Sequence, residues 1–237
     1  MPLAFTENGV IIRIKDKGGQ KMCNDIVSAI EKNKIIAIVR GIESSKCMAV
    51  AEALYLGGIR LLEITYNQSD PGSWAVTADA IRAVAQAFQG KMYAGAGTVT
   101  NTKLVELTAQ AGGRFIISPN TNAEVIRATK QADMISIPGA MTPTEILTAH
   151  DAGADFVKLF PASDLGIGYL KAIRAPINHV KLLATGGINE NNAKAFLDAG
   201  AAGLGVGGSL ANKKVIEAGE YRKLTEAAGK LISGISE

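Results

Sequence analysis

Residues 134–160 read MISIPGAMTPTEILTAHDAGADFVKLF, which has the pattern of a complete strand–helix–strand unit. The first four and the last five residues are short apolar runs, typical of strands buried in a parallel sheet. Between them, Thr142-Pro-Thr-Glu145 has the residues of a capping box, which predicts a helix from Pro143 toward His150. The glycine of Ala152-Gly-Ala154 then predicts the end of that helix.

The same unit recurs along the chain. Glycine closes the helical segment at Gly57-Gly58 and after Ala111, Ala152 and Ala199, each time just before an apolar run. Eight strands with helices between them, in about 200 residues, fit a (β/α)8 TIM barrel of the α/β class better than a doubly wound sheet. A doubly wound sheet usually has fewer strands and a GxGxxG turn after its first strand, where this chain has Val39-Arg-Gly-Ile-Glu43 instead. The predicted strands are 35–39, 60–65, 92–96, 115–118, 134–137, 156–160, 180–184 and 202–206.

One domain is expected from a chain of 237 residues with 47% apolar residues and no Pro/Ser-rich linker. Residues 1–19 precede the first predicted helix, which runs from about Met22 to Asn33. They contain a candidate strand within 9–15, and Gly18-Gly19 predict its end. We therefore predict an N-terminal extension over 1–19 and the barrel over 20–237.

Charge and composition argue against several classes of partner. A net charge of +3 is too small to supply a row of phosphate contacts, so nucleic acid is not expected to bind. Cys23 and Cys47 form no CxxC pair, and His150 and His179 lie near no cluster with metal-ligand spacing, so no metal site and no cofactor are expected. No apolar run is long enough for a membrane span, so the protein is expected to be soluble and cytoplasmic.

Lys158 is the main candidate for a catalytic residue. It lies inside the apolar run 156–160, near the carboxyl end of a predicted strand, where the active sites of such barrels occur. Burial favours the neutral amine, which could attack a carbonyl and form a Schiff base. The structural alternative is a lysine paired with a carboxylate inside the barrel.

Glu63 has a similar position in Leu61-Leu-Glu-Ile-Thr65. A buried carboxyl with a raised pKa could move protons for a Schiff-base enzyme. Alternatively, Glu63 forms a structural ion pair with Lys158 or Arg40. Lys181, at the start of its strand, is expected to lie at the stability end of the barrel and to be inert.

Arg40 and Thr98 follow the first and third predicted strands, so both should point into the mouth of the barrel. The guanidinium of Arg40 suits a substrate carboxylate. Thr98 could line the site, or it could be the N-cap of the next helix.

Glycine-rich turns follow the last two strands, in Thr185-Gly-Gly-Ile188 and in Gly205-Val-Gly-Gly-Ser-Leu210. Turns at these two places hold phosphate in many such barrels, through backbone N–H groups and a helix N-terminus. Together they predict a phosphate site rather than simple packing.

These motifs resemble the bacterial KDPG/KHG aldolases, class I enzymes that cleave 2-keto-3-deoxy-6-phosphogluconate or 4-hydroxy-2-oxoglutarate. The resemblance runs from about Ile26 to near the C-terminus and leaves residues 1–19 unexplained. The stretches that carry it are IAIVRG (36–41), LEIT (62–65), GAGTV (95–99), ISPN (117–120), IPGAMTPTE (137–145), FVKLFPA (156–162), TGG (185–187) and VGGS (206–209).

The resemblance implies a homotrimer of (β/α)8 barrels acting on keto-acid and phosphosugar-acid substrates. It implies Lys158 as the Schiff-base lysine and Glu63 as the general acid/base. Thr98 and Pro119 then fall around the pyruvate moiety. The implied phosphate-site positions are Gly186, Gly187, Gly207, Gly208 and Ser209, beside Thr185.

Two features leave the substrate open. Some family members hold the carboxylate with an arginine four residues after the catalytic glutamate, where this chain has Asn67, so Arg40 is our candidate for that role. Asn67 and Trp74 resemble the related galactonate-pathway aldolases, whereas Thr185 resembles the gluconate type.

Two other functions fit a barrel with a phosphate site. One is a phosphosugar isomerase or epimerase with Glu63 as base and no covalent intermediate, and the other is a binding protein without turnover. Neither requires Lys158 as a nucleophile.

Overall fold

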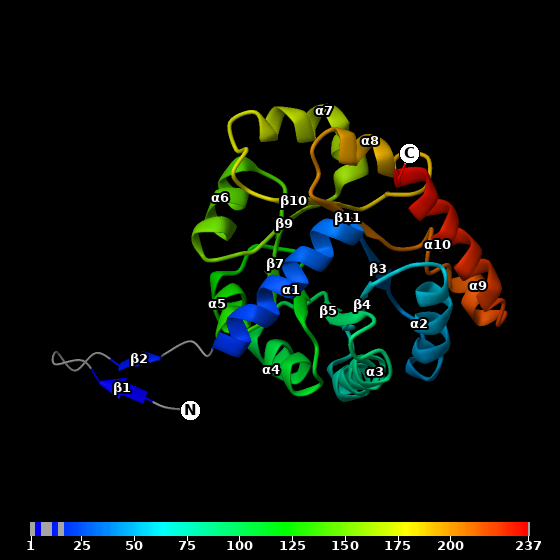
Figure 1. The fold of residues 1–237 in the computed structure, drawn as a ribbon, viewed down its shortest axis with the longest axis horizontal. Coiled ribbons are helices and arrows are strands. Elements are labelled where there is room, and N and C mark those ends of the chain that lie inside the picture. Colours follow the sequence, from blue (N-terminus) through cyan, green and yellow to red (C-terminus); the bar gives the residue numbers. More distant parts are fainter. Residues whose placement is uncertain (1–2, 6–10, 14–16, 237) are drawn as a thin grey trace.

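The computed structural model describes residues 3–5, 11–13 and 17–236. In it, parallel strands form a barrel with helices around its outside (Figure 1). The strands lie in the order β7-β6-β5-β4-β3-β11-β10-β9-β8. All eight predicted strands are confirmed: β3 (Ile35–Val39), β4 (Leu61–Thr65), β5 (Tyr93–Gly97), β6 (Phe115–Ile117), β7 (Ile135–Ile137), β9 (Val157–Leu159), β10 (Leu182–Thr185) and β11 (Gly203–Val206).

A short strand that was not predicted, β8 (Gly139–Ala140), closes the barrel. It continues β7 beyond Pro138, which has no N–H and so interrupts the ladder. β7 pairs with β6, and β8 pairs with β9. The carbonyl of Pro138 itself accepts a hydrogen bond from the Lys158 N–H at 2.8 Å. The (β/α)8 barrel is therefore confirmed.

The helix ends also follow the sequence pattern. α6 begins at Pro143 with both hydrogen bonds of the capping box between Thr142 and Glu145. A glycine after each of α2, α4, α6 and α8 has a positive φ, between +80° and +101°, which glycine adopts without strain: Gly58, Gly112, Gly153 and Gly200. The helices that alternate with the strands are α2 (Cys47–Leu56), α3 (Trp74–Ala87), α4 (Thr102–Gln110), α5 (Ala123–Gln131), α6 (Pro143–Asp151), α7 (Ala162–Arg174), α8 (Ala193–Asp198), α9 (Lys213–Glu217) and α10 (Tyr221–Ser236), with short 3₁₀ turns η1 (Ser44–Lys46) and η2 (Pro71–Ser73).

The N-terminal helix α1 (Lys17–Asn33) begins earlier than the expected Met22. The two glycines at 18 and 19 lie inside this helix rather than at the end of a strand, because helix propensity is a weak preference that the surrounding structure can override. The candidate strand within 9–15 contains β2 (Ile11–Arg13), which pairs antiparallel with β1 (Leu3–Phe5). The division between residues 19 and 20 stays a prediction.

α1 crosses the end of the barrel at which the strands begin (Figure 1). Its buried Ile26 and Ile30 pack with Phe115 and Phe156 in the barrel interior, which is therefore a filled core. A second, larger cluster lies between the strands and the outer helices. None of the described helices is long and apolar enough to cross a membrane.

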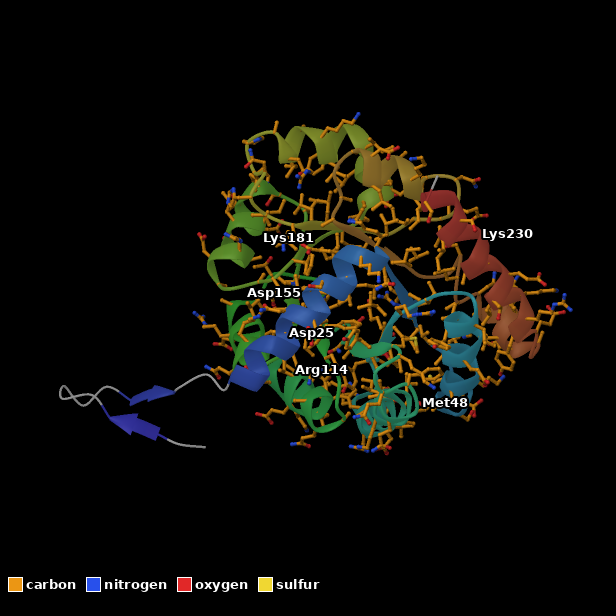
Figure 2. All side chains as sticks on the ribbon, in the orientation of Figure 1. Asp25, Met48, Arg114, Asp155, Lys181 and Lys230 are labelled. Carbon is orange, nitrogen blue, oxygen red and sulfur yellow. The ribbon has the colours of Figure 1, made fainter. Side chains whose placement is uncertain are left out.

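Lys181 lies at this same end, where it was predicted to be (Figure 2). Its Nζ is 2.7 Å from Oε1 of Glu31 on α1, and its side chain is 47% exposed. The ion pair joins the residue before β10 to α1 at the end opposite the mouth. The expected inertness of Lys181 stays a prediction.

Candidate active site

Lys158 lies on the inner face of β9, two residues after the core residue Phe156, and is only 4% exposed. Its Nζ is 4.6 Å from the centre of the Phe160 ring. Burial lowers the pKa of the Lys158 amine; the Glu63 carboxylate opposes this shift and the Arg40 guanidinium adds to it. The salt bridges of the described residues do not include Lys158. The described residues therefore offer no ion pair for the structural alternative, and the catalytic role of Lys158 stays a prediction.

Glu63 lies on the inner face of β4, two residues after the core residue Leu61, and is fully buried. Neither of its carboxyl oxygens has a hydrogen-bond partner among the described residues. Burial raises the pKa of this carboxyl, while Lys158 and then Arg40 oppose the shift. No ion pair joins Glu63 to either cation within the described part of the chain. A buried, unpartnered carboxyl costs stability, which favours a functional reason for its presence.

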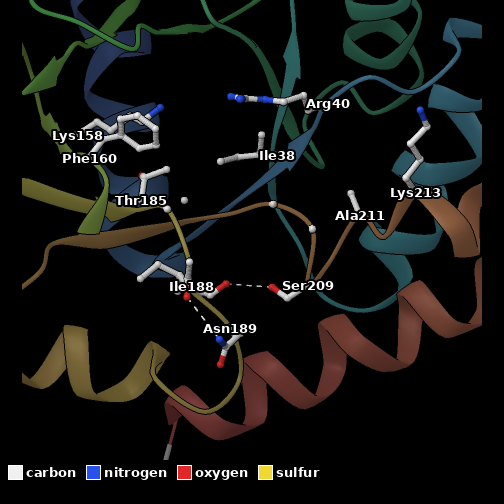
Figure 3. Close-up of a pocket in the computed structure, with 15 residues that line it drawn as sticks. Ile38, Arg40, Lys158, Phe160, Thr185, Ile188, Asn189, Ser209, Ala211 and Lys213 are labelled. Atoms are coloured by element: carbon white, nitrogen blue, oxygen red, sulfur yellow. Dashed lines mark hydrogen bonds between the residues drawn. The ribbon is translucent and has the colours of Figure 1, made fainter. Parts of the chain in front are cut away.

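A cavity of about 580 Å³ opens at the carboxyl ends of β3, β9, β10 and β11 (Figure 3). Figure 3 shows Lys158 on one side of it and Lys213 on the other. The cavity brings together most of the predicted site residues: Arg40, Lys158, Thr185, Gly186, Gly187, Gly207, Gly208 and Ser209. Its lining includes the basic side chains of Arg40, Lys158 and Lys213 and no Asp or Glu, so it suits an anionic ligand.

The two glycine-rich turns lie side by side in this cavity. The Ser209 hydroxyl donates to the carbonyl of Ile188 at 3.0 Å and so ties the turns together (Figure 3). Gly187 has a φ of +71°, and a Cβ there would lie 2.4 Å from the Cβ of Ser163. An added Cβ at Gly208 would meet nothing within 4 Å. The second turn thus leaves open space beside its backbone, as an anion-binding turn requires.

A second cavity, of about 640 Å³, shares Arg40 with the first and is lined by Thr98. The N-cap of α4 is Asn101, whose Oδ1 accepts from the Leu104 N–H at 3.1 Å, so the N-cap alternative for Thr98 is wrong. Thr98 instead has a φ of +57°. The Gln68 side chain holds this conformation by donating to the Thr98 carbonyl at 2.7 Å.

Pro119 follows β6 and lines neither cavity. Its carbonyl lies against Gly139, where an added Cβ would be 2.4 Å from the Pro119 oxygen. Gly139 is the register partner of Lys158, so Pro119 lies near the Lys158 strand without lining either cavity. Its predicted place near pyruvate stays a prediction.

Several lining residues were missed from the sequence, among them Lys213, Phe160 and Asn189. Lys213 begins α9, and its Nζ lies 3.7 Å from Oε1 of Glu217. Phe160 covers the Lys158 amine. Asn189 donates to the carbonyl of Gly187 at 3.4 Å. Lys213, four residues after Ser209, could have been found by testing which cations follow the glycine-rich turns.

A family model described as "KDPG and KHG aldolase" matches residues 26–227. The chain belongs to this family. The aldolase is therefore a carbon–carbon lyase, which excludes the isomerase and binding-protein alternatives.

Curated relatives of the aldolase carry three related names. It is 39% identical to a probable 2-dehydro-3-deoxy-6-phosphogalactonate aldolase of Rhizobium meliloti, over 80% of this chain and 86% of that protein. It is 36% identical to the 2-dehydro-3-deoxy-6-phosphogalactonate aldolase of Escherichia coli, over 76% of this chain and 85% of that protein. It is 33% identical to the KHG/KDPG aldolase of Escherichia coli, covering 84% and 90%.

Solved structures show the same fold. A native KDPGal structure matches with a TM-score of 0.75 and 33% identity, covering 85% of this chain and 94% of that one. The KDPG aldolase from Legionella pneumophila matches with a TM-score of 0.78 and 29% identity, covering 86% and 97%. The Legionella structure has pyruvate captured at low pH as a covalent carbinolamine intermediate.

Proposed function

We propose that Lys158 forms a Schiff base with the ketone of a phosphorylated 2-keto-3-deoxy sugar acid, which the aldolase cleaves to pyruvate and glyceraldehyde 3-phosphate. The observation that carries this proposal is the buried amine of Lys158, which has no ion-pair partner among the described residues and lies at the wall of a cavity that also contains Arg40 and Lys213. The carbinolamine captured in the Legionella relative supports it.

The chemistry needs an amine and a proton carrier. The neutral Lys158 amine attacks C2, and loss of water from the carbinolamine gives an iminium. Glu63 takes the proton of the C4 hydroxyl, the C3–C4 bond breaks, and its electron pair moves toward the iminium to form an enamine. The aldehyde leaves, C3 of the enamine takes up a proton, and water hydrolyses the resulting iminium to release pyruvate. The iminium is the electron sink, so the scheme uses no cofactor.

The carboxylate end and the phosphate end of the substrate would bind to different residues. We place the carboxylate at Arg40 and the phosphate at the two glycine-rich turns, with Lys213 nearby. The gluconate and galactonate epimers share these groups, and relatives named for each occur. A second candidate is 4-hydroxy-2-oxoglutarate, since a KHG/KDPG aldolase is among the relatives.

We also propose that the aldolase is a cytoplasmic homotrimer, as its family resemblance implies. Cys23 and Cys47 are both free thiols, which fits a reducing compartment. Light scattering on the purified protein measures the oligomeric state directly.

The test of the function is to incubate the protein with pyruvate, reduce it with borohydride, and map the adduct by peptide mass spectrometry. We expect one adduct, on Lys158, and turnover of at least one of the two phosphorylated epimers. An adduct on another lysine, or none on folded protein, would contradict the proposal.

Arg40→Ala should raise the pyruvate concentration needed for half-maximal trapping roughly 10- to 100-fold, because a charge-assisted contact to the carboxylate is lost. Trapping at a series of pyruvate concentrations measures this. Arg127→Ala, an exposed arginine on α5, is the control and should change nothing. Unchanged half-saturation in Arg40→Ala would exclude Arg40 as the carboxylate partner.

Lys213→Ala should raise KM for the phosphorylated substrate roughly 5- to 10-fold and leave KM for 4-hydroxy-2-oxoglutarate nearly unchanged. The reason is that Lys213 lies on the side of the cavity that would hold phosphate. The control is Lys214→Ala, an exposed neighbour that lines no described cavity. Equal changes in both KM values would refute a phosphate contact.

A further inference from the structure

Gly97, the last residue of β5, lies directly against the carboxyl group of Glu63. A Cβ added at Gly97 would stand 1.6 Å from Oε1 of Glu63 and 2.4 Å from its carboxyl carbon. Non-bonded atoms cannot approach so closely, so a side chain at 97 and the observed position of Glu63 exclude each other. Gly97 is not among the positive-φ glycines, so its backbone does not itself require glycine. Glycine is required at position 97 because the Glu63 carboxyl occupies the space of a side chain there.

The strand register explains this close approach. In the parallel pair β4–β5, Glu63 lies opposite Gly95 and Thr65 lies opposite Gly97. Alternate residues of β5 face the barrel interior, and both inner glycines make room for a neighbour. A Cβ at Gly95 would meet the Phe115 ring at 2.3 Å, as one at Gly97 would meet Glu63. The Glu63 carboxyl therefore lies against the inner wall formed by β5.

Lys158 also faces the interior, from β9. Any side chain at position 97 would push the Glu63 carboxyl off the wall and toward the middle of the barrel. β9, which carries Lys158, lies four strands from β4 in the order β4-β3-β11-β10-β9, so this displacement would bring the carboxyl nearer the amine. Among the described residues, neither Glu63 nor Lys158 forms an ion pair. The two groups are nevertheless close enough for each to shift the pKa of the other.

We propose that Gly97 is a positioning residue, which holds the Glu63 carboxyl against β5 and out of an ion pair with Lys158. This role rests on the proposed function, in which Lys158 must attack as a neutral amine. A contact ion pair would stabilise the protonated amine, which has no lone pair for the attack. Glycine at 97 thus keeps the Glu63 carboxyl near Lys158 without an ion pair that would hold the Lys158 amine in its protonated, unreactive form.

The charged groups around the amine are few. Glu63 on β4 raises the pKa of Lys158, and Arg40 at the end of β3 lowers it. Lys213 lies across the cavity, and no Asp or Glu lines that cavity. A displaced Glu63 is therefore the one negative group in this part of the described structure that could shift the titration of Lys158.

The experiment is the pH dependence of pyruvate trapping by Gly97→Ala. We expect the midpoint of the curve of trapping rate against pH to rise by about one pH unit, since a carboxylate in contact with Lys158 favours the protonated amine. We also expect kcat near neutral pH to fall about 10-fold, with little change in half-saturation by pyruvate at high pH. A midpoint that stays the same or falls would overturn the proposal.

Two comparisons separate positioning from damage to the fold. Gly95→Ala disturbs the same strand through Phe115 and not through Glu63, so its midpoint should equal that of the wild type. Adding Gly97→Ala to Glu63→Gln should leave the midpoint of Glu63→Gln unchanged, because the displaced group has no charge. If the wild-type protein forms no adduct on Lys158, the proposed function is refuted. If the wild type forms the adduct but Gly97→Ala has the same midpoint as the wild type, only the role of Gly97 is refuted.

Gly97→Ala could also be too unstable to assay, and a second variant covers that case. Truncation in Glu63→Ala removes the atoms that the new Cβ would meet. Urea unfolding should therefore show a large loss of stability for Gly97→Ala alone and a small one in the Glu63→Ala background. Equal losses in the two backgrounds would overturn the proposed contact.

Discussion

Lys158→Met should abolish the borohydride-trapped pyruvate adduct and lower kcat by at least about 10⁴-fold. Methionine keeps the length and the apolar packing of the lysine stem but has no amine to attack the ketone. Without the covalent step there is no iminium to accept the electrons of the C3–C4 bond. The measurements are peptide mass spectrometry after reduction and a coupled assay for pyruvate release.

The same variant should unfold at a higher urea concentration near neutral pH. Burial lowers the pKa of Lys158 below its unfolded value, so the native state binds fewer protons than the unfolded state between the two pKa values. The resulting cost is greatest below the native pKa and disappears as the pH rises through the unfolded value, about 10.4. The stability gain of Lys158→Met should therefore shrink at high pH.

Lys181→Met is the matched control. Lys181 is exposed, pairs with Glu31 and lies at the opposite end of the barrel, so its loss should change kcat little and stability by less than about 1 kcal/mol. A trapped adduct that survives in Lys158→Met would assign the nucleophile to another lysine.

The barrel could be predicted because its signals are local. Apolar runs, the capping box at Thr142 and the glycines that end helices each depend on a few neighbouring residues. β8 was missed because it has only two residues, Gly139 and Ala140, which show no apolar, β-branched run. The start of α1 was wrong because glycine at 18 and 19 suggested a break that the structure does not have.

The site could be predicted only in part, for a similar reason. Lys158 and Glu63 were found because charged residues are rare inside apolar strands. The position of Thr98 depends on the hydrogen bond from Gln68, which only the folded loops bring together. Gly97 looks like any other glycine of the strand until the carboxyl beside it is seen. The sequence therefore indicated the candidate reactive groups, and the structure adds the contacts around them.

Glu63→Gln should lower kcat roughly 10²- to 10⁴-fold while it raises stability near neutral pH. Glutamine has nearly the same shape but can no longer take the proton of the C4 hydroxyl. Burial raises the pKa of Glu63, so the native state binds more protons than the unfolded state. Burying Glu63 therefore costs no stability below the pKa of the unfolded state, about 4.3. The cost grows as the pH rises above that value, because the carboxyl then ionises in the unfolded state.

The gain in stability should therefore be small at pH 4 and larger at pH 7.5, which urea unfolding at the two pH values measures. Glu145→Gln provides the opposite case. The backbone N–H groups of Met141 and Thr142 lower the pKa of the Glu145 carboxyl, so that residue stabilises the fold above its unfolded pKa and its replacement should cost stability without affecting kcat. If Glu63→Gln instead lost stability and kept its kcat, Glu63 would be a structural group like Glu145, and the proton carrier would have to be sought elsewhere in the mouth.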